Sequence, residues 1–373
     1  DREMEQAMVK LAHNPFTPTF GCVPPELAGR DTLITDILEG LDNAPGDPNR
    51  ATIFVGARGT GKTVLLTAVA ERAEMRGWVS VNVTDRYGML SEIIVQLRQK
   101  ASHLLTPETY SWLSEIHVHG VGFTRTKEEA PSTWRADMTK AIGELNEKDT
   151  GLLITVDEVS AQSDELSVLI DSFQHFVRER RDVALLLAGL PHNVSTLIDV
   201  DATSFLRRAF KHSMDQISAT DTSYAIKETV EGAGRGIAVD ALKVAADASE
   251  GYAFLIQLLG YHAWRQHPER GVITLKDMEQ AVAFARDDMY RMVLEPTVNS
   301  LSERELEFLT AMAEGEGPHR VSDIAGLMGI SENNATKIRA RLIEQEIIGA
   351  RRRGFVDFGM PMIRDYLTKG QYI

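Results

Sequence analysis

The segment Gly56-Ala-Arg-Gly-Thr-Gly-Lys62-Thr63 lies between a short apolar stretch, 52–55, and a run of apolar residues at helical spacing, 62–76. Glycines permit a tight turn in which backbone N–H groups converge, and the helix that follows presents the positive end of its dipole. This strand–loop–helix pattern is typical of a phosphate site, in which the lysine reaches the β- and γ-phosphates and the threonine hydroxyl binds Mg²⁺. The alternative is a glycine-rich turn with a chance Lys-Thr pair. The pattern and its flanks favour the phosphate site.

Short apolar stretches alternate with helical patterns over the first half of the chain. Near-continuous apolar strands of four to six residues indicate a parallel sheet that is buried on both faces. We therefore predict an α/β fold, a doubly wound parallel sheet of the P-loop NTPase class. The predicted strands are 52–55, 78–83, 152–156 and 183–187, and the predicted helices are 62–76, 89–105, 132–146 and 164–180.

Strand signals stop near residue 218, and glycines then separate a series of helical patterns, which suggests a small all-α domain. A third unit begins near Pro296, with three helical patterns and an alternating stretch around Arg353-Gly354 that resembles a hairpin. The segment 117–131 resembles a loop or small hairpin. The predicted domains are 1–218 for the P-loop domain, 219–295 for a helical lid and 296–373 for a winged helix-turn-helix.

A second chemical signal is the apolar strand Leu152–Val156, which ends in the carboxylates of Asp157 and Glu158. In P-loop enzymes the first acid holds Mg²⁺ and an adjacent Glu can orient and deprotonate the attacking water. An acidic pair after a strand is otherwise a loop start or a helix cap. With the glycine-rich segment upstream, we favour Asp157 as the metal residue and Glu158 as the candidate base.

Composition excludes several classes of protein. The chain has 373 residues, 43% of them apolar, and 40 basic against 54 acidic residues give a net charge of -14. No apolar run approaches the ~18–20 residues of a membrane helix, so we expect no membrane association. One cysteine, Cys22, excludes an intramolecular disulfide, and the N-terminus lacks a secretory pattern, so we expect a cytoplasmic protein.

The two motifs, their spacing, and Leu27-Ala-Gly-Arg30 ahead of the first strand resemble AAA+ ATPases, and within them the origin-recognition-type and archaeal-type ATPases. The resemblance covers nearly the whole chain. It implies ATP and Mg²⁺ as ligands, Lys62 and Glu158 as catalytic residues, and Thr63 and Asp157 at the metal. It also implies an adenine role for Leu27, Gly29 and Arg30, for which a helix cap with a surface arginine is the alternative. The implied phosphate-binding residues are Gly56, Ala57, Arg58, Gly59, Thr60, Gly61, Lys62, Thr63 and Val64.

The chain departs from this family at two places and keeps a candidate arginine at a third. No Asn, Ser or Thr stands in Ala188–Pro191, where many AAA+ proteins have a polar residue that senses the γ-phosphate; Asn193 is the nearest. No Arg or Lys stands in Gly251–Phe254, where the family has a sensor arginine, so hydrolysis is expected to be slow. Arg207 and Arg208 lie where a neighbour-reaching arginine could act, and we assign Arg208 this catalytic role, with exposed loop arginines as the alternative.

The C-terminal unit contains the only marked basic concentration, six basic against two acidic residues in 333–353. The segments 321–331 and 334–342 resemble a helix-turn-helix, whose second helix would enter the major groove of double-stranded DNA. The predicted DNA contacts are Asn334, Lys337, Arg339 and Arg341 on that helix and Arg351, Arg352 and Arg353 on the wing. Such units also pack on the nucleotide domain or hold a protein partner, and that alternative remains open.

The leading hypothesis is an Mg-ATP-binding ATPase that binds ATP and ADP and acts as a nucleotide-dependent, DNA-associated switch. The alternative is a regulator with little turnover that retains ATP and holds a protein partner, or a second copy of itself, through residues 301–373. The missing sensor residues favour the alternative, and the intact Glu158 favours hydrolysis.

Overall fold

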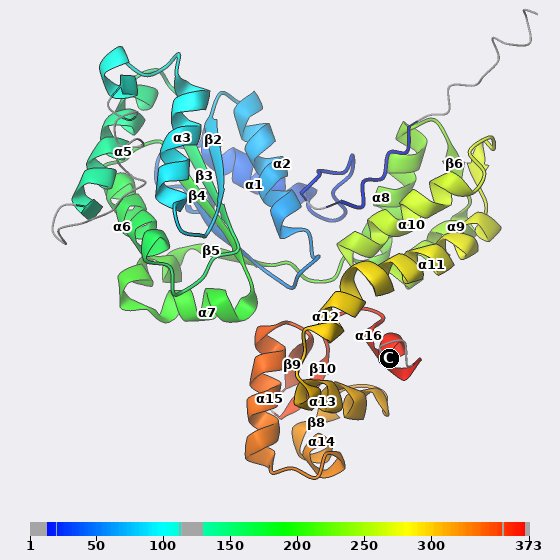
Figure 1. Ribbon diagram of the computed structural model, residues 1–373. Helices are drawn as coiled ribbons and strands as arrows, with labels where there is room; N and C mark the ends of the chain where they lie inside the picture. Colours follow the sequence, from blue (N-terminus) through cyan, green and yellow to red (C-terminus); the bar gives the residue numbers. More distant parts are fainter. Residues whose placement is uncertain (1–12, 20, 112, 114–129, 353, 370–373) are drawn as a thin grey trace, which may run out of the picture. The chain divides into compact units, whose positions relative to one another are not determined.

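The computed structural model describes residues 13–369 except 20, 112, 114–129 and 353 (Figure 1). The predicted loop or hairpin at 117–131 therefore lies almost entirely outside the described residues. Backbone contacts divide the chain into two units. The first comprises Asp1–Gly29, Ala57–Thr60 and Asp215–Ile373, and the second comprises Arg30–Gly56 and Gly61–Met214.

The second unit is built on a five-stranded parallel sheet in the order β2-β3-β4-β1-β5. Ile53 and Phe54 on β1 are both fully buried. Because successive residues of a strand point to opposite faces, both faces of the sheet are covered. The predicted α/β fold with a parallel sheet is confirmed. The strands are β1 (Ala51–Val55), β2 (Val79–Thr84), β3 (Leu152–Asp157), β4 (Val183–Gly189) and β5 (Phe210–Ser213).

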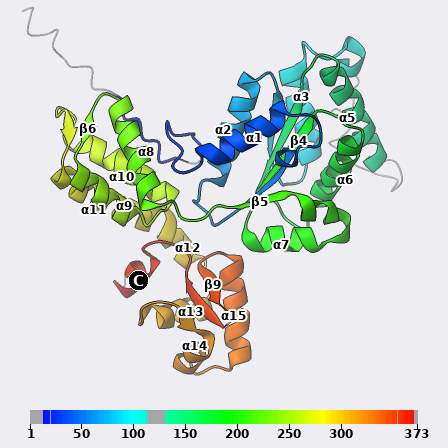
Figure 2. The ribbon, with the colours of Figure 1, turned by 180° about the vertical axis from the view of Figure 1, so that it is seen from behind.

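Helices connect these strands, and their apolar stripes form the core. The helices α3, α5 and α6 share a buried cluster with the sheet, and α1 packs against α2 (Figures 1 and 2). Ser163 caps α6, where its hydroxyl accepts a hydrogen bond from Leu166 N. The helices are α1 (Asp31–Asp42), α2 (Lys62–Met75), α3 (Met89–Ala101), α5 (Ala130–Asn146), α6 (Asp164–Arg178) and α7 (Pro191–Asp199), with 3₁₀ turns η1 (Pro48–Arg50) and η2 (Asp201–Arg208).

The first unit begins with a helical part, which corresponds to the predicted all-α region. Its helices are α8 (Ala219–Gly232), α9 (Val239–Ser249), α10 (Ala253–Gln266) and α11 (Leu275–Met289). The structure adds a pair of two-residue parallel strands, β6 (Gly236–Ile237) and β7 (Val272–Ile273). The all-α prediction is therefore corrected. Strands of two residues are too short to produce a periodic pattern in the sequence.

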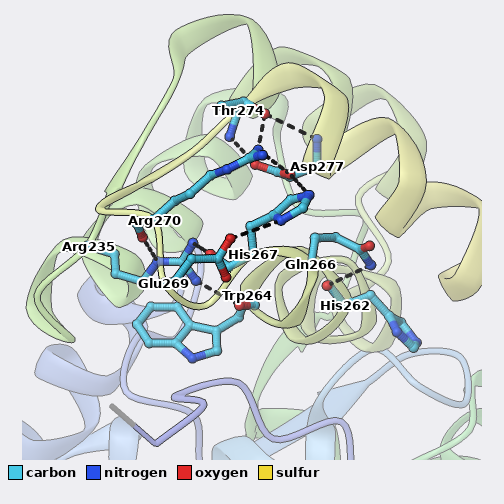
Figure 3. A network of polar contacts seen from close by, with 9 residues as sticks. All are labelled: Arg235, His262, Trp264, Gln266, His267, Glu269, Arg270, Thr274 and Asp277. Atoms are coloured by element: carbon cyan, nitrogen blue, oxygen red, sulfur yellow. Dashed lines mark hydrogen bonds and ion pairs between the residues drawn. The ribbon is translucent and has the colours of Figure 1, made fainter. Parts of the chain in front are cut away.

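A polar network fixes the turn that carries β7 (Figure 3). The guanidinium of Arg235 donates hydrogen bonds to the carbonyl oxygens of Trp264, His267 and Arg270 and lies 4.8 Å from the centre of the Trp264 ring. Asp277 is buried and forms a capping box with Thr274, while His267 and Arg270 lie within 3.7 Å of its second oxygen. The buried Asp277 is thus paired with charged groups and the buried Arg235 is satisfied by carbonyl oxygens, which makes this network a structural anchor.

The C-terminal part of the first unit combines short helices with a three-stranded antiparallel sheet in the order β8-β10-β9. A capping box between Ser302 and Glu305 begins α13. The elements are η3 (Tyr290–Leu294, π-helical), α12 (Glu295–Asn299), α13 (Glu303–Ala313), β8 (His319–Arg320), α14 (Val321–Leu327), α15 (Glu332–Glu344), β9 (Ile348–Arg352), β10 (Phe355–Phe358) and α16 (Ile363–Thr368). Among the described helices of the whole chain, none has the length and apolar character to cross a membrane.

Candidate functional site

The glycine-rich loop follows β1 directly and leads into α2. Gly59 and Gly61 have φ values of 76° and 89°, in the left-handed region that glycine adopts without steric cost. Gly61 occupies the N-cap position of α2 and contributes no side chain there, so the first backbone N–H groups of the helix are not capped by it. The backbone N–H groups at a helix N-terminus are donors suited to a phosphate.

Lys62 is 9% exposed, and its ammonium donates a 2.6 Å hydrogen bond to the carbonyl oxygen of Gly56. The lysine stem is therefore folded back along the loop, with its charge held at the beginning of the loop. A phosphate bound by this loop would lie within reach of that charge.

Thr63 and Asp157 are 94 residues apart in the chain, and the sheet brings them into contact. The Thr63 hydroxyl donates a short hydrogen bond to Asp157 Oδ2. Asp157 ends β3, and Glu158 N donates to Asp157 Oδ1 at 2.9 Å. Hydroxyl and carboxylate oxygens are ligands that Mg²⁺ prefers, and this ion usually takes only one or two from protein and keeps several waters. The two predicted metal residues therefore fit Mg²⁺.

Glu158 is exposed and has a φ of 56°, an uncommon conformation for a residue with a Cβ atom. The backbone on both sides is fixed, because Asp85 N donates to Asp157 O before it and Val159 N donates to Ala188 O on the neighbouring strand β4 after it. Local strain that the surrounding structure maintains is frequent at functional sites. The carboxylate of Glu158 is thus displayed beside Asp157 without being buried.

Residues Ala57–Thr60 of the loop make contacts inside the first unit. Arg58 N donates a 2.8 Å hydrogen bond to Glu346 Oε2, and the Tyr252 hydroxyl donates a 2.7 Å hydrogen bond to Arg58 O. A Cβ atom at Gly59 would lie 2.0 Å from the Tyr252 hydroxyl oxygen. Burial, together with the Glu346 carboxylate, raises the pKa of Tyr252 to about 12, so the hydroxyl stays protonated and can donate. Sequence reasoning missed Tyr252 and Glu346, since only folding brings them to this loop.

The remaining predicted nucleotide residues are placed as follows. Thr60 donates from its hydroxyl to Ala57 O at 2.7 Å, and Val64 lies half-buried in the first turn of α2. Leu27 is half-buried, and Gly29 is exposed with a φ of 65°. Arg30 is half-buried at the N-cap position of α1. An adenine role for Leu27, Gly29 and Arg30 stays a prediction.

The departures from the family pattern have structural counterparts. Gly189, at the end of β4, faces Val159 and Val194 so closely that a Cβ atom would lie 2.6 Å from Val159 Cγ2. A side chain at position 189 would therefore have to displace Val159. Asn193 lies in α7. In η2, Arg207 and Arg208 are exposed, and Arg207 Nε donates to Ile198 O; the catalytic role of Arg208 stays a prediction.

The predicted DNA contacts on α15 divide between two sides of the helix. Asn334, Lys337 and Arg341 are exposed, and their spacing of three and four residues places them on one face. Arg339 flanks the buried side instead and is half-buried, with an Nε that has no hydrogen-bond partner in the described part of the chain. Arg353 and the side chain of Arg351 lie outside the described residues.

The three-stranded sheet β8-β10-β9 carries a cationic group that the sequence only partly indicates. Arg352 lies 3.8 Å and Arg320 5.4 Å from the centre of the Phe355 ring, and both arginines are exposed. The register of β8 and β10 pairs Arg320 with Phe355, although 35 residues separate them in sequence. Sequence reasoning missed Arg320 because only strand pairing brings it beside Phe355.

Comparisons with known proteins agree with this architecture. Residues 291–367 match a family described as Domain of unknown function (DUF8462). No curated protein matches the sequence.

Solved structures of two proteins resemble this chain over more than nine-tenths of its length. A Walker-type ATPase of Pyrococcus abyssi has a TM-score of 0.60 at 15% identity, over 92% of this chain and 96% of that one. The Aeropyrum pernix ORC2 protein in ADPNP–ADP complexes has a TM-score of 0.61 at 14% identity, over 94% and 96%, and its ADP form has a TM-score of 0.51 at 14% identity, over 95% and 97%. The chain has the P-loop ATPase fold of these proteins, and the predicted resemblance is confirmed as a likeness of fold.

Proposed function

We propose that this chain binds ATP with Mg²⁺ and hydrolyses it to ADP and phosphate. The observation that carries the proposal is the contact of Thr63 with Asp157, beside Lys62 at the start of α2 and Glu158 at the end of β3. Within the second unit, this arrangement joins the lysine at the start of α2, a pair of oxygen ligands for a cation and a carboxylate.

The roles of the residues follow from their chemistry. The loop N–H groups and the Lys62 ammonium bind and neutralise the phosphates. Thr63 and Asp157 would hold Mg²⁺, which when bound offsets the charge that develops on the transferred phosphoryl group. Glu158, which is exposed, orients the attacking water and accepts its proton. Arg208 is proposed to act on the transition state at a neighbouring site.

The test is phosphate release by the purified chain beside a Glu158→Gln variant. Removal of the base should lower the rate by about 10²–10⁴-fold while fluorescent-ATP affinity stays within about twofold. A Lys62→Ala variant should lose the affinity itself. Equal phosphate release by wild type and Glu158→Gln would contradict hydrolysis.

We further propose that residues 296–373 form a winged helix that binds double-stranded DNA under nucleotide control. Support for control comes from the first unit, where the P-loop residue Arg58 is hydrogen bonded to Glu346 and to Tyr252. A nucleotide that reorders the loop changes these bonds and so favours one arrangement over another. Support for DNA comes from the exposed cations Lys337, Arg341 and Arg352.

Fluorescence anisotropy of a labelled random duplex tests this second proposal. Binding should differ between ATP and ADP and weaken steeply with salt, because cations that meet phosphates release counterions. Absence of binding in every nucleotide state at low salt would contradict it.

A second candidate function is a regulator that retains ATP with little turnover and holds a protein partner through residues 301–373. The absence of Asn, Ser or Thr in Ala188–Pro191 favours it, as does the absence of Arg or Lys in Gly251–Phe254, near which the resemblance leads us to expect a sensor arginine. Phosphate release equal to that of Glu158→Gln, together with retained ATP binding, would select this function.

A further inference from the structure

The loop that begins after β2 lies directly beside the predicted catalytic carboxylates. Thr84 at the end of β2 pairs with Asp157 at the end of β3, and Asp85 N extends the ladder with a 2.9 Å hydrogen bond to Asp157 O. The segment that joins β2 to α3 (85–88) and the segment that joins β3 to α6 (158–163) therefore start at the same edge of the sheet.

Two carboxylates connect these segments in opposite directions. Asp85, from the first segment, accepts a 2.7 Å hydrogen bond from Ser160 N in the second. Glu165, in the first turn of α6, accepts hydrogen bonds of 2.8 Å from Gly88 N and Leu90 N. Charged acceptors make the stronger class of hydrogen bond, so this reciprocal pair fixes both segments.

The backbone that Asp85 holds, at Ser160, lies two residues after Glu158. Asp157 Oδ1, Ala188 O and Asp85 Oδ2 accept hydrogen bonds from three successive N–H groups, those of Glu158, Val159 and Ser160. The first two acceptors lie on strands of the sheet, while Asp85 lies on a loop. The backbone that follows the left-handed Glu158 is therefore held by the sheet at Val159 and by a loop carboxylate at Ser160.

We propose that Asp85 and Glu165 are positioning residues that hold Glu158 in place for water attack. The inference rests on the proposed hydrolysis. The two side chains contact backbone groups and not the reacting atoms. Their loss should displace Glu158 without removing any group that binds the nucleotide. A misplacement of ~1 Å in a catalytic group can lower a rate by about 10²-fold.

The experiment measures steady-state phosphate release, fluorescent-ATP affinity and Tm for Asp85→Ala and Glu165→Ala. We expect kcat to fall by about 10–100-fold, with ATP affinity changed by less than about twofold. Asp85→Asn keeps an acceptor for Ser160 N and should recover part of the rate. Asp164→Ala is the matched control, because Asp164 is an exposed carboxylate beside Glu165 in the same turn of α6.

Each outcome separates the inference from the proposed function. If wild type exceeds Glu158→Gln while Asp85→Ala and Glu165→Ala match wild type, hydrolysis stands and the positioning role is wrong. If both alanine variants lose ATP affinity together with kcat, or if Asp85→Asn recovers nothing, the carboxylates have a general structural role and the inference is overturned. If wild type equals Glu158→Gln, hydrolysis is absent and both fall. If Glu165→Ala fails to fold, Glu165→Gln is measured in its place under the same criteria. This variant keeps one acceptor oxygen and carries an amide group in place of the other oxygen. If Asp85→Ala fails to fold, Asp85→Asn is compared directly with wild type.

Discussion

At the scale of single residues, Asp137 in α5 is a buried acid without an evident counter-charge. It is 1% exposed, and neither carboxylate oxygen accepts a hydrogen bond within the described part of the chain. Burial raises the pKa of this carboxyl from 3.8 to about 6. A group whose pKa is higher in the folded state binds more protons there, so stability falls as pH rises through this range.

Asp137→Asn should therefore stabilise the protein at neutral and alkaline pH. Because the variant carries no charge at this position, we expect a gain of about 1–3 kcal/mol in the free energy of unfolding at pH 8. The gain should shrink at pH 5, where the wild-type carboxyl is largely protonated in the fold. Urea unfolding at both values measures it. A variant that is less stable than wild type at pH 8 would show that the carboxylate has a stabilising partner.

The sequence indicates some site residues and not others for a physical reason. Lys62, Thr63 and Asp157 belong to local patterns, each a loop or a strand end whose chemistry is visible within a few residues. Asp85, Glu165, Tyr252 and Glu346 act at positions that are distant in sequence, through backbone groups. A backbone N–H has the same chemistry at every residue, so no side-chain pattern announces its partner.

At the scale of elements, α15 provides a test in which one helix supplies both variant and control. Lys337→Ala combined with Arg341→Ala removes two exposed cations from one face. We expect duplex affinity to fall and the slope of log affinity against log salt to decrease by about 2, since each phosphate contact contributes ~0.9. Arg339→Ala, on the other flank, should change the slope by less than about 0.3.

Anisotropy titrations across a salt series measure these slopes. Equal effects of Arg339→Ala and of the double variant would contradict a DNA contact by the Asn334–Lys337–Arg341 face. A loss of helix content in any variant, seen by circular dichroism, would exclude that variant from the comparison, and Lys337→Gln would then replace the alanine.

The elements that the sequence revealed are those with buried, repetitive patterns. The strands β1 to β4 are buried and apolar, and each was predicted within two residues of its observed ends. The strand β5 was not predicted, because it lies at the edge of the sheet and three of its four residues are exposed. An edge strand is specified by pairing with its neighbour, and its sequence need not be apolar.

At the scale of the whole molecule, nucleotide control of DNA binding makes a thermodynamic demand. If ATP and ADP change duplex affinity by different factors, the duplex must change the affinities for ATP and ADP by the same factors. Coupling free energies of this kind are typically about 1–3 kcal/mol, or about 5–150-fold. Glu158→Gln is the suitable background, because ATP then persists during the titration.

Fluorescent-ATP titrations of Glu158→Gln, with and without saturating duplex, should therefore reproduce the factor found by DNA anisotropy. Glu346→Gln, added to that background, weakens the carboxylate that accepts from Arg58 N, so it should reduce the coupling factor at least about threefold and leave DNA affinity in the nucleotide-free state unchanged. Glu344→Gln, an exposed neighbour at the end of α15, is its control. A nucleotide-dependent DNA affinity without the reciprocal effect would mean that ATP acts through the solution, for example by chelating Mg²⁺, and not through a switch in this chain. If the reciprocal coupling is present and Glu346→Gln does not reduce it, the nucleotide-dependent switch stands, but the contact of Glu346 with Arg58 N is not part of it.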